Sequence, residues 1–247
     1  QTVHHGLWDY DNPAAPNLMN IVVDGEPRKA VAQITKQGFV FTFDRVTGEP
    51  IWPIEERDVP TDTDMPGEVV SPTQPFPTRP RPIEFQGVSE NDVLDFTPEL
   101  HAEGLEILKD YTIGPLFTPP QMKQTILRPG LGGGPNWTGA AFDPESGWLY
   151  VPSQADYSVV AFYSPEEEGI GTLKYTHGAR GGRAQGPRGL PLFKPPYSRI
   201  VAIDMNTGDV VWDVPNGPGD AVRNHPDLKH LDLPELGDDH RGAPLLT

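Results

Sequence analysis

A carboxylate and a lysine at a fixed spacing are the residues of this chain best suited to chemistry. Asp9 lies in the segment His-His-Gly-Leu-Trp-Asp-Tyr-Asp at 4–11, and Lys36 follows it by 27 residues in Thr-Lys-Gln-Gly at 35–38. A carboxylate is ionised near neutral pH and accepts a hydroxyl proton, whereas an ammonium stabilises negative charge as it develops. The pair therefore suits a site that takes a proton from an alcohol while a bound electron acceptor takes the hydride.

Neither residue identifies such a site by itself. An Asp that follows a Trp in a loop is more often a turn or cap residue than a base, and a lone Lys at the start of a strand is usually solvated. The case for Asp9 and Lys36 therefore depends on the elements that position them.

Three segments of the chain share one turn pattern. Residues 42–52 and 202–212 each read as a strand, an Asp-x-x-Thr-Gly turn and a returning strand with a Trp four residues after the Gly, and residues 141–150 form a weaker copy. In such a turn the Asp bonds the turn amides and the Gly takes the left-handed conformation. We expect Trp52 and Trp212 to pack between neighbouring sheets. The repetition favours a β-propeller over ordinary hairpins or a sandwich.

The rest of the chain predicts short strands joined by long ordered loops. Further apolar runs predict strands at 20–24, 29–34, 39–43, 149–152, 158–162 and 199–203, which together with the repeats make roughly three to four blades. The 30 Pro and 26 Gly shorten the regular elements. The longest loop runs over 53–120 and holds a short helix at 98–110 with a Pro in its first turn. Loops of this length usually cover or line a site.

The composition excludes several classes of function. The net charge of −16, from 19 basic and 35 acidic residues, argues against a nucleic-acid partner, because such binding needs Lys and Arg to neutralise phosphates. The chain has no Cys, which excludes disulfides, thiolate metal sites and Cys nucleophiles. No apolar window is long enough to predict a transmembrane helix. Because the chain opens on Gln1 without a Met and residues 243–247 read as the start of a strand, we expect an internal fragment.

Several longer motifs accompany the Trp-bearing turns. They are His-Gly-Leu-Trp-Asp-Tyr-Asp at 5–11, Thr-Lys-Gln-Gly at 35–38, Ser-Pro-Thr-Gln-Pro-Phe-Pro at 71–77, Gly-Pro-Leu-Phe-Thr-Pro-Pro at 114–120 and Gly-Gly-Gly-Pro-Asn-Trp-Thr-Gly at 132–139. Together these motifs resemble the pyrroloquinoline quinone (PQQ) dependent dehydrogenases, in particular their membrane-bound glucose dehydrogenase branch. The resemblance covers essentially the whole chain. It implies an all-β fold, an eight-bladed propeller with tryptophan-docking repeats. Residues 1–247 would form a partial PQQ-binding propeller domain, its middle to later blades, with 53–120 as a long loop insertion.

The resemblance also implies roles for four residues. Asp9 matches the family's catalytic aspartate, and Lys36 matches the basic residue that contacts the ortho-quinone oxygens, at the family's spacing. Asn136 and Trp137 match an Asn-Trp pair at the cofactor's edge, with Asn136 the better candidate for a polar contact. The family also binds a Ca²⁺ or Mg²⁺ ion beside PQQ, with protein ligands mostly in earlier blades. We therefore expect no metal ligand in this chain.

The implied function is oxidation of a sugar (an aldose such as glucose) or a polyol or alcohol, with hydride transfer to PQQ and Asp9 as general base. Membrane ubiquinone is the implied electron acceptor, and the implied location is the periplasm, with attachment to the inner membrane only through an N-terminal part outside this chain. The alternative is a non-catalytic β-propeller scaffold or binding protein, which has no reason to keep Asp9, Lys36 and Asn136 at family spacing. We expect the isolated 247 residues not to turn over substrate, because missing blades leave sheet edges open and remove much of the cofactor floor.

Three other motifs have plainer interpretations. Asn136-Trp137-Thr138 is a formal glycosylation sequon, and the glycines at 130–134 resemble a phosphate loop but lack the following Lys-Ser/Thr and helix. A set of His and Asp residues in an acidic, Pro-rich loop could attract a transition metal, although its irregular spacing favours a solvated loop. Its members are His225, His230, Asp238, Asp239 and His240.

Overall fold

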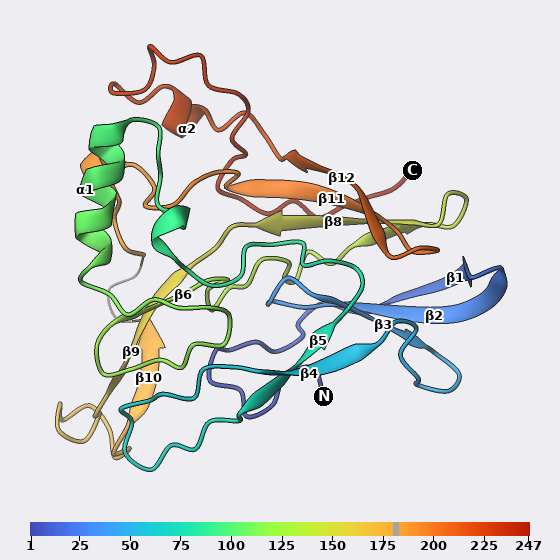
Figure 1. Cartoon of the computed structure of the whole chain (residues 1–247), viewed down its shortest axis with the longest axis horizontal. Helices are drawn as coiled ribbons and strands as arrows, with labels where there is room; N and C mark the ends of the chain where they lie inside the picture. Colours follow the sequence, from blue (N-terminus) through green and yellow to red (C-terminus); the bar gives the residue numbers. More distant parts are fainter. Residues whose placement is uncertain (180–182) are drawn as a thin grey trace.

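The computed structural model describes residues 1–179 and 183–247 as a mostly β structure (Figure 1). Its strands and helices are β1 (Asn17–Val23), β2 (Glu26–Ile34), β3 (Val40–Asp44), β4 (Ile54–Asp58), β5 (Thr73–Pro77), η1 (Glu90–Asp92), α1 (Pro98–Leu108), β6 (Thr125–Leu127), β7 (Ala141–Asp143), β8 (Trp148–Gln154), β9 (Ser158–Tyr163), β10 (Thr176–Ala179), η2 (Pro187–Gly189), β11 (Ser198–Asp204), β12 (Asp209–Pro215) and α2 (Asp220–Arg223).

Within these described ranges the strands form four sheets. Their strand orders are β1-β2-β3, β10-β9-β6, β12-β11-β8-β7 and β4-β5, and the strands pair antiparallel. Figure 1 shows the β12-β11-β8-β7 sheet lying above the β1-β2-β3 sheet, with α1 and α2 on the left of the view. This arrangement of short antiparallel sheets agrees with the blade-like hairpins expected from the sequence.

The β1-β2-β3 and β12-β11-β8-β7 sheets share one apolar core. β1 alternates buried Met19, Ile21 and Val23 with exposed side chains, as a strand with one covered face must. These buried side chains pack in one cluster with residues of β8 and β11 such as Val151 and Val201. The alternation in the sequence therefore sets which face of β1 turns toward the neighbouring sheet.

The three repeated turns have the same construction. The carboxylates of Asp44, Asp143 and Asp204 each accept a hydrogen bond from the backbone N–H two residues further on, at 2.8, 2.9 and 2.9 Å. In each turn the Gly four residues after the Asp has a positive φ. Hydrogen bonds from the Val46 and Thr47 amides hold the pKa of Asp44 below its ordinary value. The turns predicted from the repeats are confirmed.

The two repeat tryptophans pack in different ways. A Cβ at Gly208, the turn glycine of one repeat, would come within 3.0 Å of the indole of Trp52 from the other repeat. Trp52 also packs on the core between the two sheets, so the expected packing between neighbouring sheets is confirmed for it. Trp212 instead packs beside Tyr150 of its own sheet, with ring centroids 5.8 Å apart.

Segment 53–120 contains more regular structure than its sequence predicts. α1 begins at Pro98 as expected, where the Thr97 side chain accepts a hydrogen bond from the Leu100 amide at 3.3 Å, and it ends at Leu108 rather than at 110. The β4–β5 hairpin was not predicted, because β4 is highly charged and β5 contains two prolines. None of the described helices is long and apolar enough to cross a membrane.

Candidate active site

Two buried aromatic neighbours turn Asp9 outward. Trp8 is fully buried and its Nε1 donates to the Thr118 carbonyl at 2.8 Å, while the buried Tyr10 hydroxyl donates to the Pro129 carbonyl at 2.7 Å. Burial raises the pKa of Tyr10, so this hydroxyl keeps its proton and its donor role. Between them, Asp9 has a φ of 59°, a left-handed conformation that Asp adopts more readily than most residues. Its side chain is 59% exposed.

Lys36 lies directly beneath Asp9, in the turn between β2 and β3. Its Nζ donates to the Asp9 carbonyl at 2.8 Å, to Oδ2 of Asp9 at 3.1 Å and to Oδ1 of Asp11 at 2.5 Å. These three acceptors match the three donors of an ammonium. The Lys36 side chain is 7% exposed, whereas both aspartates are more than half exposed. The predicted pair is therefore in direct contact, with a nearly buried cation under two carboxylates that face solvent.

The loop at 132–137 forms a wall of the Lys36 site. A Cβ at Gly133 would lie 2.5 Å from both Cβ and Cγ of Lys36, and Gly133 has a φ of 68°. The Gly134 amide donates to the Lys36 carbonyl at 3.0 Å. Only glycine allows this close approach at 133, because any other residue would clash with Lys36 and strain the backbone.

The side chains of Asn136 and Trp137 lie at the far end of this loop. Nδ2 of Asn136 donates to the Gly132 carbonyl, and its Oδ1 accepts from the Trp137 amide at 2.7 Å. Both hydrogen bonds stay inside the loop, so Asn136 supports the loop's own shape. The Trp137 residue is 78% exposed. The structure thus places the loop of Asn136 and Trp137 against Lys36, without joining their side chains to it.

Two residues adjacent in sequence to the predicted site residues have a buried polar atom without a hydrogen-bond partner among the described residues. The atoms are Oε1 of Gln37, next to Lys36 in sequence, and Oγ1 of Thr138, next to Trp137. Unpaired buried polar atoms are uncommon in native proteins and call for a water or ligand as partner. Both atoms flank residues that the sequence assigned to a cofactor.

Two charged residues at the site were missed by the sequence reasoning. Asp11 is the second carboxylate on Lys36, and its position two residues after Asp9 was the available signal, because the buried Tyr10 lies between two exposed carboxylates. Arg241 donates through Nε to the Gly134 carbonyl at 3.0 Å and through Nη2 to the Gly132 and Gly133 carbonyls at 3.1 and 2.5 Å. More than a hundred residues separate it from this loop, and no sequence pattern links them.

A buried ion pair supports both the Lys36 turn and the glycine loop. Glu84 has a fully buried side chain whose Oε2 accepts from the Ser153 hydroxyl at 2.6 Å, and its Oε1 lies 3.4 Å from Nη2 of Arg199. A Cβ at Gly134 would come within 2.8 Å of Glu84 Cγ. Because Ser153 belongs to β8 and Arg199 to β11, Glu84 links the floor of the site to the large sheet.

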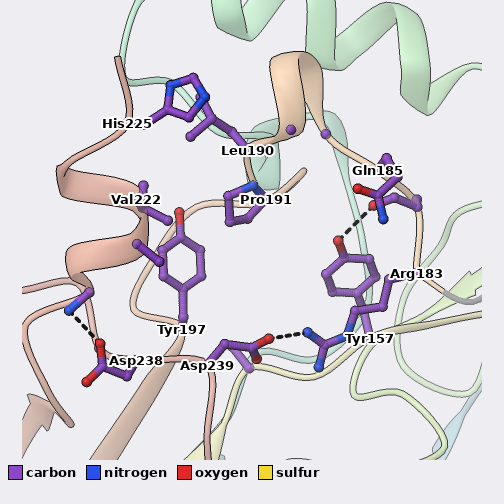
Figure 2. Close-up of a pocket in the computed structure, with 17 residues that line it drawn as sticks. Tyr157, Arg183, Gln185, Leu190, Pro191, Tyr197, Val222, His225, Asp238 and Asp239 are labelled. Carbon is purple, nitrogen blue, oxygen red and sulfur yellow. Dashed lines mark hydrogen bonds and ion pairs between the residues drawn. The ribbon is translucent and has the colours of Figure 1, made fainter. Parts of the chain in front are cut away.

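A cavity of about 300 Å³ opens near α2 (Figure 2). Figure 2 shows Arg183 paired with Asp239 at its edge, with an Nη1 to Oδ2 distance of 2.5 Å. Nη2 of Arg183 lies 2.7 Å from Oδ1 of Asp156, and Oδ2 of Asp156 lies 3.9 Å from Nη2 of Arg241. These ion pairs connect the cavity wall to the glycine loop.

The His and Asp residues of the 225–240 loop are not gathered into a cluster of three in the described part of the chain. The described residues contain no group of three or more His, Cys, Asp or Glu able to hold a metal ion. Asp238 instead accepts a hydrogen bond from the Gly219 amide at 2.9 Å, and Asp239 pairs with Arg183. These two aspartates therefore have structural contacts, and the loop interpretation remains a prediction.

Comparison of the sequence with known proteins identifies the family of the chain. The family profile described as PQQ glucose/ethanol/alcohol dehydrogenase, β-propeller domain, matches residues 1–247. The chain is 32% identical to the glycerol dehydrogenase large subunit of Gluconobacter oxydans, in an alignment covering 100% of this chain and 37% of that protein. It is 32% identical to quinate/shikimate dehydrogenase (quinone) of Acinetobacter baylyi, covering 87% and 29%, and 31% identical to quinoprotein glucose dehydrogenase of Escherichia coli, covering 86% and 28%.

The chain spans roughly a third of the length of these relatives. Because the family profile extends over all 247 residues, it confirms both the resemblance seen in the motifs and the all-β propeller class. The chain belongs to the β-propeller family of the PQQ-dependent glucose, ethanol and alcohol dehydrogenases.

Proposed function

We propose that the protein containing this chain is a PQQ-dependent dehydrogenase that oxidises the CH–OH group of a sugar, polyol or other alcohol. The observation that carries the proposal is the solvent-facing carboxylate of Asp9 held 3.1 Å from the nearly buried ammonium of Lys36. Relatives named for glycerol, quinate/shikimate and glucose support this class of substrate.

The residues around Asp9 and Lys36 are suited to one edge of PQQ, which is an acidic ortho-quinone. Lys36 offers the cation, and the adjoining loop carries Asn136 and the exposed indole of Trp137. The buried, unpaired polar atoms of Gln37 and Thr138 belong to residues next to Lys36 and Trp137 in the sequence. When bound, PQQ supplies the two-electron acceptor to which the hydride of the substrate carbon passes.

Asp9 is the group that takes the proton in this proposal. Oxidation of an alcohol to a carbonyl breaks the O–H bond and the adjacent C–H bond. The hydroxyl proton passes to the Asp9 carboxylate, and the hydride leaves with both electrons of the C–H bond. A positioned base of this kind contributes about 10²–10⁴-fold to the rate. The buried anchors Trp8 and Tyr10 fix the backbone on both sides of Asp9 and so hold the carboxylate at the surface.

Lys36 has two tasks in the same proposal. By bonding both the carbonyl and the carboxylate of Asp9, it restricts the rotation of the base. Because water reaches so little of its side chain, its charge is weakly screened. Asp9 and Asp11 already engage the ammonium, so it stabilises the negative charge that develops on a neighbouring group during reduction by shifting a hydrogen bond from one of these carboxylates to that group.

The electron acceptor and the location complete the proposal. We assign membrane ubiquinone as the acceptor and the periplasm as the compartment, in line with the relative named as a quinone-dependent quinate/shikimate dehydrogenase. The Ca²⁺ or Mg²⁺ ion expected with PQQ finds no group of three suitable ligands in the part of the chain that the structure describes.

Reconstitution tests the proposed function. The full-length protein would be loaded with PQQ and Ca²⁺ or Mg²⁺, and dye reduction would be measured with glucose, glycerol, quinate and ethanol. We expect PQQ-dependent reduction with at least one of these substrates and none when PQQ is omitted. Measured PQQ binding with no reduction would favour the scaffold alternative. A protein that does not bind PQQ would refute the proposal.

A further inference from the structure

Arg241 contacts the glycine loop in an unusual way. Its guanidinium, on a side chain that is 22% exposed, donates to the carbonyl oxygens of three consecutive residues, Gly132, Gly133 and Gly134. Arg presents five donors in a rigid planar fork, which suits several fixed acceptors at once.

The glycine loop needs support from outside itself. Glycine loses more conformational freedom on ordering than any other residue, and these residues have no side chains with which to pack. The loop must nevertheless keep its shape, because Gly133 lies against the Lys36 side chain and the Gly134 amide bonds the Lys36 carbonyl. A guanidinium bound to all three carbonyls supplies the missing restraint.

The charge of Arg241 is itself held in place. Asp156 lies 3.9 Å from its Nη2 and within hydrogen-bond distance of Arg183, which pairs in turn with Asp239 (Figure 2). Positive and negative groups therefore alternate from the loop to the cavity wall. Asp156 also lies beside Gly132, where an added Cβ would come within 2.7 Å of its carboxylate.

We propose that Arg241 is a positioning residue that fixes the backbone of residues 132–134 against Lys36 and so presets Asn136 and Trp137 for the cofactor. The second half of this statement rests on the proposed function, whereas the first half concerns only the loop. Arg241 touches no reacting atom in this proposal. It acts through the carbonyls of the loop and through the wall that the loop presents to Lys36.

The first test measures amide hydrogen exchange of the full-length protein without PQQ. The Gly133 amide donates to the Gly130 carbonyl and the Gly134 amide to the Lys36 carbonyl, so exchange at these positions reports on the loop directly. The variants are Arg241→Met, which keeps the stem without the donors, and Arg241→Lys, which keeps the charge without the fork. Arg223→Met is the matched control, because Arg223 is also partly buried and bonds a backbone carbonyl, that of Leu233.

We expect exchange at residues 133 and 134 to accelerate by about tenfold to a hundredfold in both Arg241 variants, the factor expected for lost charge-assisted hydrogen bonds. Exchange in β8 and β11 should stay unchanged, which shows that the variants fold. Arg223→Met should leave the loop unchanged. A third variant, Arg241→Ala, leaves room for a free guanidinium ion, and adding that ion should restore protection, which a general loss of packing would not allow. Unchanged loop exchange in Arg241→Met and Arg241→Lys would overturn the proposal.

The second test measures the dissociation constant of PQQ. We expect it to rise by about tenfold or more in Arg241→Met, with partial recovery on addition of guanidinium ion to Arg241→Ala. An unchanged dissociation constant beside a loosened loop would overturn the cofactor half of the proposal. If the unaltered protein binds no PQQ, the proposed function fails, and the exchange experiment still decides the role of Arg241.

Discussion

Replacing Gly133 by Ala is the sharpest perturbation of the contact between the glycine loop and Lys36. The new Cβ would lie 2.5 Å from Cβ and Cγ of Lys36 and 2.7 Å from its Cα. Rotation of the lysine side chain cannot relieve a clash with its own backbone, so either the loop or the turn at 35–38 has to move. The loop is held by Arg241 and the turn by its strands, so neither moves freely.

The magnitude follows from two contributions. A non-glycine residue in the left-handed region costs about 1–2 kcal/mol, and forcing extra carbon into a filled space costs about 1–3 kcal/mol more. We therefore expect Gly133→Ala to lower the free energy of unfolding by about 2–5 kcal/mol. Gly139 provides the matched control, because its φ of 69° is nearly the same as that of Gly133 and an added Cβ would meet nothing within 4 Å. Gly139→Ala should cost only about 1–2 kcal/mol.

Urea unfolding of the two variants beside the unaltered protein measures this difference. The expected gap between Gly133→Ala and Gly139→Ala is about 1–3 kcal/mol, which is the steric part alone. Gly133→Ala should also weaken PQQ binding, whereas Gly139→Ala should change it far less. Equal destabilisation by the two substitutions would refute the close packing of the loop on Lys36.

Three other predictions concern the neighbours of Asp9 and a repeat turn. Trp8→Phe leaves the Thr118 carbonyl unpaired and opens a small void, so urea unfolding should show a free energy of unfolding lower by about 2–4 kcal/mol. A decrease of less than about 1 kcal/mol would contradict the anchoring role. Asp11→Asn keeps an acceptor for Lys36 but removes one exposed negative charge, and it should change the PQQ dissociation constant by less than about fivefold. A larger change would make the charge of Asp11 a main determinant of the site. Because the pKa of Asp44 is lowered in the folded state, its stabilising contribution is complete above the ordinary Asp pKa of about 4 and is lost as the pH falls below it. Asp44→Asn, which keeps an acceptor but cannot ionise, should therefore lose less stability than the unaltered protein between about pH 5 and pH 3, and identical acid sensitivity of the two proteins would contradict this.

The sequence predicted those elements whose own residues decide their structure. Asp44 and Asp204, each followed four residues later by Gly, carry the whole turn in one short segment, and the structure has both turns as expected. The buried strands β8 and β11 were likewise visible as apolar runs. The β4–β5 hairpin was not, because charges and prolines argue against a strand and only its tertiary setting makes one.

The same distinction holds for the site. Asp9 and Lys36 were identified by their type, their spacing and the motifs around them, and the structure brings them into contact. The cofactor role assigned to Asn136 remains a proposal, since its side chain bonds within its own loop. Arg241 could not be found, because its contacts depend on how the last residues of the chain return to a loop far back in the sequence. A single Arg in an acidic loop carries no sign of that return.

Transfer of the substrate proton to Asp9 is the central claim, and single-turnover kinetics test it most directly. The reduction of bound PQQ by substrate would be followed by absorbance in the unaltered protein, in Asp9→Asn and in Asp24→Asn. Asp24 is an exposed aspartate with a φ of 53°, so Asp24→Asn controls for the lost charge and the left-handed backbone. We predict that Asp9→Asn slows the reduction by about 10²–10⁴-fold with little change in PQQ affinity, and that Asp24→Asn leaves both unchanged. A rate in Asp9→Asn close to that of the unaltered protein would remove Asp9 from the role of base.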